Sequence, residues 1–74
     1  MDEALEVFKM NVELYPCSAN VYDSLGEAYM NIGDTANAIK NYKRSLELNP
    51  ENTNAVEMLK RLEKKQTFYE ANKR

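Results

Sequence analysis

Apolar side chains recur along most of this chain with the period of an α-helix. In residues 35–48 one face carries positions i, i+1, i+4, i+7 and i+8, and the charged residues lie away from it. The members of this face are Ala38, Ile39, Tyr42, Ser45 and Leu46. Residues 19–32 show the same pattern, with an apolar sector made of Val21, Tyr22, Leu25, Ala28, Tyr29 and Ile32. The pattern predicts two amphipathic helices that follow each other directly.

The residues between these two segments predict a tight turn. Gly33 suits the left-handed conformation just past a helix end, and Asp34 can accept backbone N–H groups as the cap of the next helix. Pro50 ends the second segment, and Asn52 or Thr53 can cap a further helix. We therefore expect an antiparallel helix hairpin followed by another helix.

Two flanking helices complete the predicted fold. A first helix capped by Asp2 should stop before Pro16, with Ser18 capping the next one. A last helix should run through Ala55, Val56, Leu59 and Leu62. The sequence thus predicts an all-α fold of about four helices in a single domain, since 74 residues leave no room for a second.

The chain also repeats itself. A shift of 34 residues aligns five identical pairs between residues 1–16 and 35–50: Ala4 with Ala38, Lys9 with Lys43, Glu13 with Glu47, Leu14 with Leu48, and Pro16 with Pro50. The same shift places Leu5 on Ile39 and Phe8 on Tyr42. It continues weakly into the last helix, where Asn54 and Leu59 take the places of Asn20 and Leu25. An internal period of this length is typical of stacked helix hairpins.

The spacing of these signature residues resembles the tetratricopeptide repeat. The residues that carry the resemblance are Tyr22, Leu25, Gly26, Tyr29, Ala38, Tyr42 and Pro50. The sequence departs from the family pattern at Tyr22, where Trp is commonest, and at Ser45, where Ala usually sits. The resemblance implies one complete repeat over residues 19–52, the second helix of a preceding repeat over residues 1–18, and a capping helix over residues 53–74.

Gly26 predicts a close contact between helices. A glycine inside a helix costs about 1 kcal/mol relative to alanine, so a neighbouring helix should need the space. The aromatic residues at signature packing positions, Phe8, Tyr22, Tyr29 and Tyr42, are expected in the core. In the last helix Lys60 takes the place of Gly26, so we expect no partner helix on that face.

The resemblance implies a groove that binds an extended peptide or a partner helix. On the first helix of the repeat the matching positions are Asn20, Asp23, Glu27, Met30 and Asn31. On the capping helix they are Asn54, Glu57, Arg61, Lys64 and Lys65. One wall is then acidic and the other basic. Asp23 stands where the carboxylate-clamp form of the family has Lys, which disfavours recognition of a free C-terminal carboxylate.

The first helix carries an apolar stripe that one neighbouring helix cannot cover. Its residues are Ala4, Leu5, Phe8 and Val12, widened by Val7, Met10 and Leu14. Exposed stripes of this kind mark contacts. Two copies could pair through Leu5, Phe8 and Val12, or the chain could be a structural, terminal appendage of a larger protein that covers the stripe.

The sequence offers few residues of the types that catalytic sites use. The absence of His removes Ser-His and Cys-His arrangements and the common metal ligand sets, so we expect a non-catalytic protein without cofactor or metal. Cys17 reads as a tolerated turn residue, and a lone cysteine fits a reducing compartment and favours the cytoplasm.

Charge leaves a weak alternative. Residues 1–50 hold eight acidic and four basic residues, whereas residues 51–74 hold four and six. Nucleic-acid binding through Lys60, Arg61, Lys64, Lys65 and the Phe68–Tyr69 pair is therefore considered, but the imbalance is mild. No apolar run approaches the ~20 residues of a membrane span. The sequence favours a protein–protein interaction module.

Overall fold

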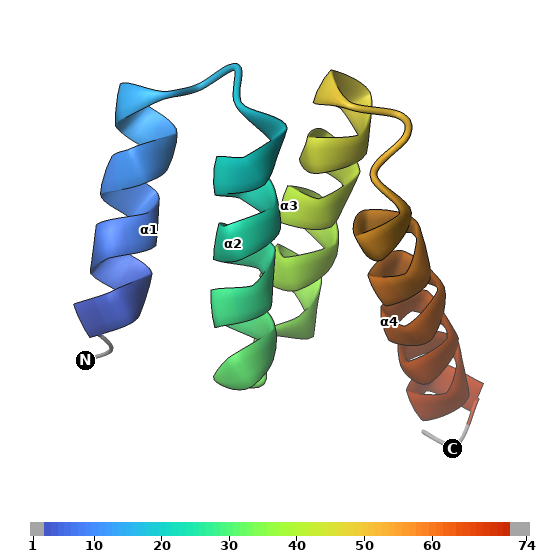
Figure 1. Cartoon of the computed structure of the whole chain (residues 1–74). Helices are drawn as coiled ribbons and strands as arrows, with labels where there is room; N and C mark the ends of the chain where they lie inside the picture. The colour runs from blue at the N-terminus through green and yellow to red at the C-terminus, as the bar shows by residue number, and fades with distance from the viewer. Residues whose placement is uncertain (1–2, 72–74) are drawn as a thin grey trace.

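The chain folds into four α-helices that lie side by side (Figure 1). The computed structural model describes the backbone of residues 3–71 and the side chains of residues 3–64. The helices are α1 (Glu3–Leu14), α2 (Ala19–Asn31), α3 (Thr35–Leu48) and α4 (Thr53–Ala71). Consecutive helices run in opposite directions, so α2 and α4 point the same way. The all-α prediction is confirmed, and the predicted cap Asp2 lies outside the described residues.

The turn between α2 and α3 forms as its two residues predict. Gly33 has a φ of 84°, in the left-handed region, and its N–H donates to the carbonyl of Met30 at 3.0 Å. The Asp34 N–H donates to the carbonyl of Tyr29 at 2.9 Å. The Asp34 side chain accepts the backbone N–H of Asn37 at 3.2 Å and so caps α3. The hairpin is therefore closed at both helix ends.

The other two helix starts differ from each other. Ser18 occupies the N-cap position of α2 with extended backbone, as predicted, but its side chain makes no cap hydrogen bond with the described residues. The turn is held instead by the Tyr22 hydroxyl, which donates to the carbonyl of Pro16 at 2.9 Å. At α4 the Asn52 Oδ1 accepts the N–H of Ala55 at 3.3 Å, so Asn52 rather than Thr53 is the cap.

The buried core lies between α2, α3 and α4. The main cluster consists of Ala38, Ile39, Tyr42, Ala55, Leu59 and Leu62. Leu25 and Ala28 of α2 are buried as well. α1, every residue of which is described, contributes no buried side chain. The fold thus has a tightly packed three-helix body and a more loosely attached first helix.

The aromatic residues do not share one environment. Tyr42 is fully buried, as predicted. Tyr29 is half-buried and packs against the core cluster, which agrees with its predicted place. Phe8 and Tyr22 are only half-buried and are not part of that cluster, so their predicted place in the core was wrong. The reason is that Tyr42 sits between two packed helices, whereas in the described part of the chain Phe8 has only α2 beside it.

At Gly26 the backbone of α2 lies close to the Tyr42 ring of α3. A Cβ built on this glycine would lie 3.1 Å from Cδ2 and Cε2 of the Tyr42 ring. Such a distance is shorter than ordinary van der Waals contact, so an alanine would push against a buried ring. The close packing that Gly26 predicts is therefore present, and its partner is Tyr42.

Candidate protein-docking surfaces

The predicted groove residues of α2 and α4 fall into an exposed set and a set engaged in packing. The exposed ones are Asn20, Glu27 and Asn31 of α2 and Asn54, Glu57, Arg61 and Lys64 of α4. Asp23 and Met30 are half-buried. Met30 packs against the core cluster. The side chain of Lys65, like those of Phe68 and Tyr69, lies outside the described residues.

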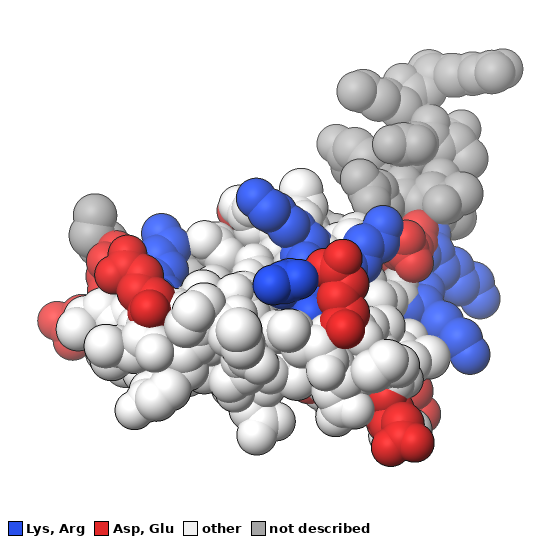
Figure 2. All heavy atoms as spheres, turned by 90° about the horizontal axis from the view of Figure 1, so that it is seen from above, with Lys and Arg blue, Asp and Glu red and all other residues white. Residues whose placement is uncertain are grey.

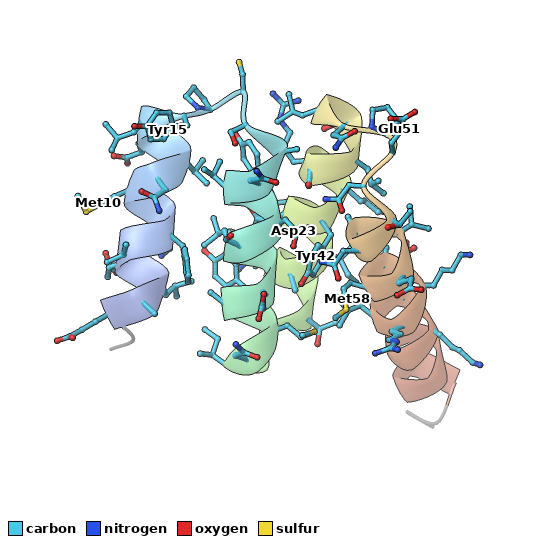
Figure 3. All side chains as sticks on the ribbon, in the orientation of Figure 1. Met10, Tyr15, Asp23, Tyr42, Glu51 and Met58 are labelled. Atoms are coloured by element: carbon cyan, nitrogen blue, oxygen red, sulfur yellow. The ribbon has the colours of Figure 1, made fainter. Side chains whose placement is uncertain are left out.

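Asp23 connects α2 to the start of α4. Its carboxylate accepts from Asn52 Nδ2 at 2.8 Å and from Asn54 Nδ2 at 3.0 and 3.2 Å (Figure 3). Two predicted groove residues, Asp23 and Asn54, are thus bonded to each other across the two helices. This pairing holds the two walls of the predicted groove at a fixed separation.

Ser45 extends this network into the core. Its hydroxyl is fully buried, donates to the carbonyl of Ala19 at 2.8 Å and accepts from Asn52 Nδ2 at 3.0 Å. The serine that departs from the family pattern therefore has a use: it ties α3 both to the first turn of α2 and to the cap of α4. A buried hydroxyl needs such partners, because an unpaired one costs about 1–3 kcal/mol.

The network changes the electrostatic surroundings of Tyr42. Burial raises the pKa of Tyr42 from its ordinary 10.0 to about 12, and the negative charges of Asp23 and Glu27 add to that effect. Tyr42 therefore stays neutral in the core beside two carboxylates.

Charge is divided between the two ends of the molecule. α1 carries the exposed acids Glu3, Glu6 and Glu13. α1 also carries one exposed base, Lys9. Most of the exposed basic residues that the structure describes lie on α3 and α4, together with the exposed acids Glu47, Glu57 and Glu63; these basic residues are Lys40, Lys43, Arg44, Lys60, Arg61 and Lys64. Figure 2 shows this division from above, with most of the blue side chains over α3 and α4. Lys43 also pairs with Glu63 at 3.5 Å, which links α3 and α4 on the surface.

The apolar stripe of α1 is arranged differently from its prediction. Leu5, Phe8 and Val12, the residues proposed for self-association, are half-buried. The most exposed apolar side chains are instead Val7, Met10 and Leu14, at 55%, 58% and 66% exposure. Met10 points away from α2 (Figure 3). The surface of α1 that faces outward is thus apolar, with acidic residues along it.

A hollow of about 210 Å³ lies between α1 and α2. Its lining residues are Ala4 and Phe8 of α1 and Ser24, Glu27, Ala28 and Asn31 of α2. Two of the predicted groove residues, Glu27 and Asn31, therefore share a site with Phe8 of the apolar stripe. The sequence pattern alone does not join these surfaces, and it does not single out Ser24 or Ala28 as site residues. The 34-residue period is the signal that could have identified Ser24 as a residue at a helix contact. It places Ser24 on Met58, and Met58 packs against the core cluster.

Other kinds of site are not found in the part of the chain that the structure describes. Within it, no group of three or more His, Cys, Asp or Glu side chains is placed to hold a metal ion. None of the helices, as far as they are described, is long and apolar enough to cross a membrane. Cys17 is exposed in the turn between α1 and α2.

Comparison with known families agrees with the geometry of the hairpin. The tetratricopeptide repeat family model matches residues 19–52, which are α2, α3 and the turn that follows them. Residues 19–52 form a tetratricopeptide repeat. No curated protein matches the chain in a sequence search. Tetratricopeptide repeats in general bind proteins or peptides and are typically non-catalytic.

Proposed function

We propose that this protein docks an extended peptide or a partner helix on the face formed by α2 and α4. This groove face consists of the exposed residues Asn20, Glu27 and Asn31 of α2 and Asn54, Glu57, Arg61 and Lys64 of α4. The supporting observation is the hydrogen-bonded joint of Asp23 with Asn52 and Asn54, which fixes the two helices before any partner arrives. Preformed surfaces bind with a smaller loss of conformational entropy.

The chemistry of the groove face sets the kind of partner. Glu27 on α2 and Arg61 and Lys64 on α4 present opposite charges on neighbouring helices. A peptide complements both helices when it has a basic residue on the side that faces Glu27 and an acidic residue on the side that faces Arg61 and Lys64. Asp23 and Asn54 act mainly through the joint, because a partner that bonded them would have to replace hydrogen bonds already present.

A displayed library of random peptides selected on the immobilised protein tests this proposal. Peptides that bind the parent should lose affinity for Glu27→Lys and for Arg61→Glu, by about tenfold where the charge pair is desolvated. Lys40→Glu is the matched control, since Lys40 is an exposed cation on α3 outside the groove face. Equal binding by the parent, both groove variants and the control, with all four folded by circular dichroism, would refute the groove face.

A further inference from the structure

The internal repeat shows that α1 has one covering helix fewer than α3. The 34-residue shift places Ala4 on Ala38 and Phe8 on Tyr42. Ala38 and Tyr42 are 0% and 1% exposed, because α3 packs against both α2 and α4. Ala4 is exposed and Phe8 half-buried. In the repeat α1 corresponds to α3 and α2 corresponds to α4, so the α1–α2 contact is equivalent to the α3–α4 contact. α3 also packs against α2, and within residues 3–71 no helix packs against α1 in the equivalent way.

The hollow between α1 and α2 marks the uncovered side. It is lined by Ala4 and Phe8, the equivalents of the two residues that α2 buries on α3. We call this hollow, with the six lining residues given above, the α1 slot. We propose that the α1 slot takes an amphipathic helix from a partner protein, packed on α1 as α2 packs on α3, with a small residue facing Phe8 and a basic residue beside Glu27.

The α2–α3 contact gives the size of the residue that faces Phe8. On α3 the ring of Tyr42 lies close to Gly26, since a Cβ built there would be 3.1 Å from the ring and the ring would have to shift to admit it. Phe8 stands at the equivalent point of α1 and presents the same six-membered ring. A bulky side chain on the incoming helix would therefore hold the two helices apart.

The α2–α4 contact gives the position of the basic residue. Asp23 of α2 bonds Asn54 of α4, and these helices run in the same direction, so Met30 and Arg61 each lie two turns further along their own helix. The 34-residue shift places Asn20 on Asn54 and Glu27 on Arg61. Glu27 lines the slot, so a cation on the incoming helix at the position that corresponds to Met30, toward the same end as Glu27, is favourable.

The charges of α1 favour a partner of different sequence over a second copy. If two copies paired their α1 helices in antiparallel fashion, Glu6 and Glu13 of one copy would face Glu13 and Glu6 of the other along the same edge. If α4 of a second copy entered the slot instead, Lys60 would stand at the position of Gly26 and meet Phe8. The first arrangement sets like charges against each other, and the second sets a long charged side chain against the Phe8 ring, where the repeat has a glycine.

The slot is distinct from the proposed groove face in the residues that decide it. Ala4, Phe8, Ser24 and Ala28 belong to the slot and not to the groove face, and no α4 side chain that the structure describes lines it. Glu27 and Asn31 are common to both. A variant of Phe8 and a variant of Arg61 therefore test the two proposals separately.

A peptide derived from α2 is the probe. It has the sequence of residues 18–33 with Asp23→Asn, which removes an unneeded acid, and Met30→Lys, which supplies the cation. Binding to the full chain is measured by fluorescence anisotropy of the labelled peptide, and the bound site is mapped by amide chemical shifts. We expect binding with shifts on α1 and on the slot side of α2.

A second peptide with the further change Gly26→Leu should bind at least about tenfold more weakly. A third peptide, which has Glu instead of Lys at position 30, should bind about twofold to fivefold more weakly than the first peptide.

Variants of the protein complete the test. Ala4→Leu fills the slot at an exposed position, and Phe8→Ala removes the ring. Each should lower the affinity for the first peptide by about tenfold. Met10→Ala, on the outward face of α1, and Arg61→Glu, on the groove face, are matched controls that should leave its affinity unchanged. The proposal is overturned if the first peptide does not bind the folded parent, if Gly26→Leu or Ala4→Leu has no effect, or if mass measurements over a concentration series show a dimer that blocks the peptide.

Discussion

Gly26 and Tyr42 form a pair in which each residue explains the other. The glycine lacks a side chain because the buried ring occupies the space, and the ring can be buried because the glycine lets α2 approach. Helix propensity alone would favour alanine at this position by about 1 kcal/mol. Packing opposes this preference, since the ring is held by the core cluster and cannot move aside without disturbing its neighbours.

Replacing Gly26 by Ala should therefore destabilise the protein. The gain in helix propensity is about 1 kcal/mol, and the overpacking cost of about 1–3 kcal/mol exceeds it, so a net loss of about 1 kcal/mol in the free energy of unfolding is expected. Urea denaturation measures this. In a Tyr42→Leu background the same change should be neutral or stabilising, because the ring is gone. A stabilising Gly26→Ala in the parent would contradict the close contact.

The raised pKa of Tyr42 predicts a loss of stability at high pH. In the unfolded chain this tyrosine ionises near its ordinary value of 10.0, and in the folded protein near 12. Below pH 10.0 both states keep the proton, so the stability is fully present. Between the two values only the unfolded state releases it, so the free energy of unfolding falls as the pH rises, by about 3 kcal/mol in all.

Urea denaturation at a series of pH values from about 9 to about 12 checks this decline. Tyr42→Phe is the matched control, because it keeps the ring and removes the ionising group. Its stability should change much less across this range. If the parent and Tyr42→Phe decline in parallel, Tyr42 does not hold its proton as described.

Asn52 joins three helices with one side chain. Its Oδ1 caps α4, and its Nδ2 donates to Asp23 of α2 and to Ser45 of α3. Helix positions in small proteins are usually fixed by apolar packing, which is not directional. Here a polar joint adds direction, and it does so at the end of the hairpin where α4 begins.

Asn52→Ala should cost about 2 kcal/mol of unfolding free energy, since the cap is worth about 1 kcal/mol and Asp23 and Ser45 lose a partner. Thermal and urea denaturation report the loss. Asn41→Ala is the control: Asn41 Nδ2 donates to the Asn37 carbonyl within the same helix at 2.8 Å, and its loss should cost less than about 0.5 kcal/mol. Similar costs for the two variants would show that the joint carries no special weight.

Local signals predict the helices well and their polar connections poorly. Periodicity and the Gly33–Asp34 pair are enough to place α2 and α3, because both depend on residues close in sequence. Asp23 and Asn54 are separated by 31 residues, and nothing in either local segment indicates that they bond. Ser18 has the right type and backbone for a cap, yet the orientation of its side chain depends on the surrounding turn.

The candidate surfaces show the same division. Helical periodicity predicts which face of α2 is exposed, and Asn20, Glu27 and Asn31 are exposed. It does not predict the α1 slot, because a hollow depends on how far apart two helices lie. The half-burial of Phe8 has the same origin: its position in the repeat predicts a packed ring, but the number of neighbouring helices decides how much of it is covered.

The molecule as a whole has a firm body and a less stable first helix. α3 and α4 form the core cluster and α2 packs against it, whereas α1, all of it described, buries no side chain and packs mainly on α2. Local stability follows the burial of apolar contacts, so α1 should open without unfolding the other helices.

Amide hydrogen exchange should therefore be faster in α1 than in α3 under native conditions. The comparison of Phe8 with Tyr42 is the most direct, because these residues are equivalent in the internal repeat. Binding of the α2-derived peptide to the α1 slot should slow exchange in α1 and leave α3 nearly unchanged. Equal protection of α1 and α3 in the free protein would show that α1 belongs to the same cooperative unit.

Lys60 also decides where this chain could acquire additional repeats. A copy of α3 placed directly after α4 would bring a ring of the type of Tyr42 onto Lys60, whereas the glycine that accepts such a ring stands in α2. A unit inserted ahead of residue 53 would keep every glycine opposite a ring and leave α4 at the end. Tandem duplication in a gene of this kind is therefore tolerated on one side of residue 53 and penalised on the other.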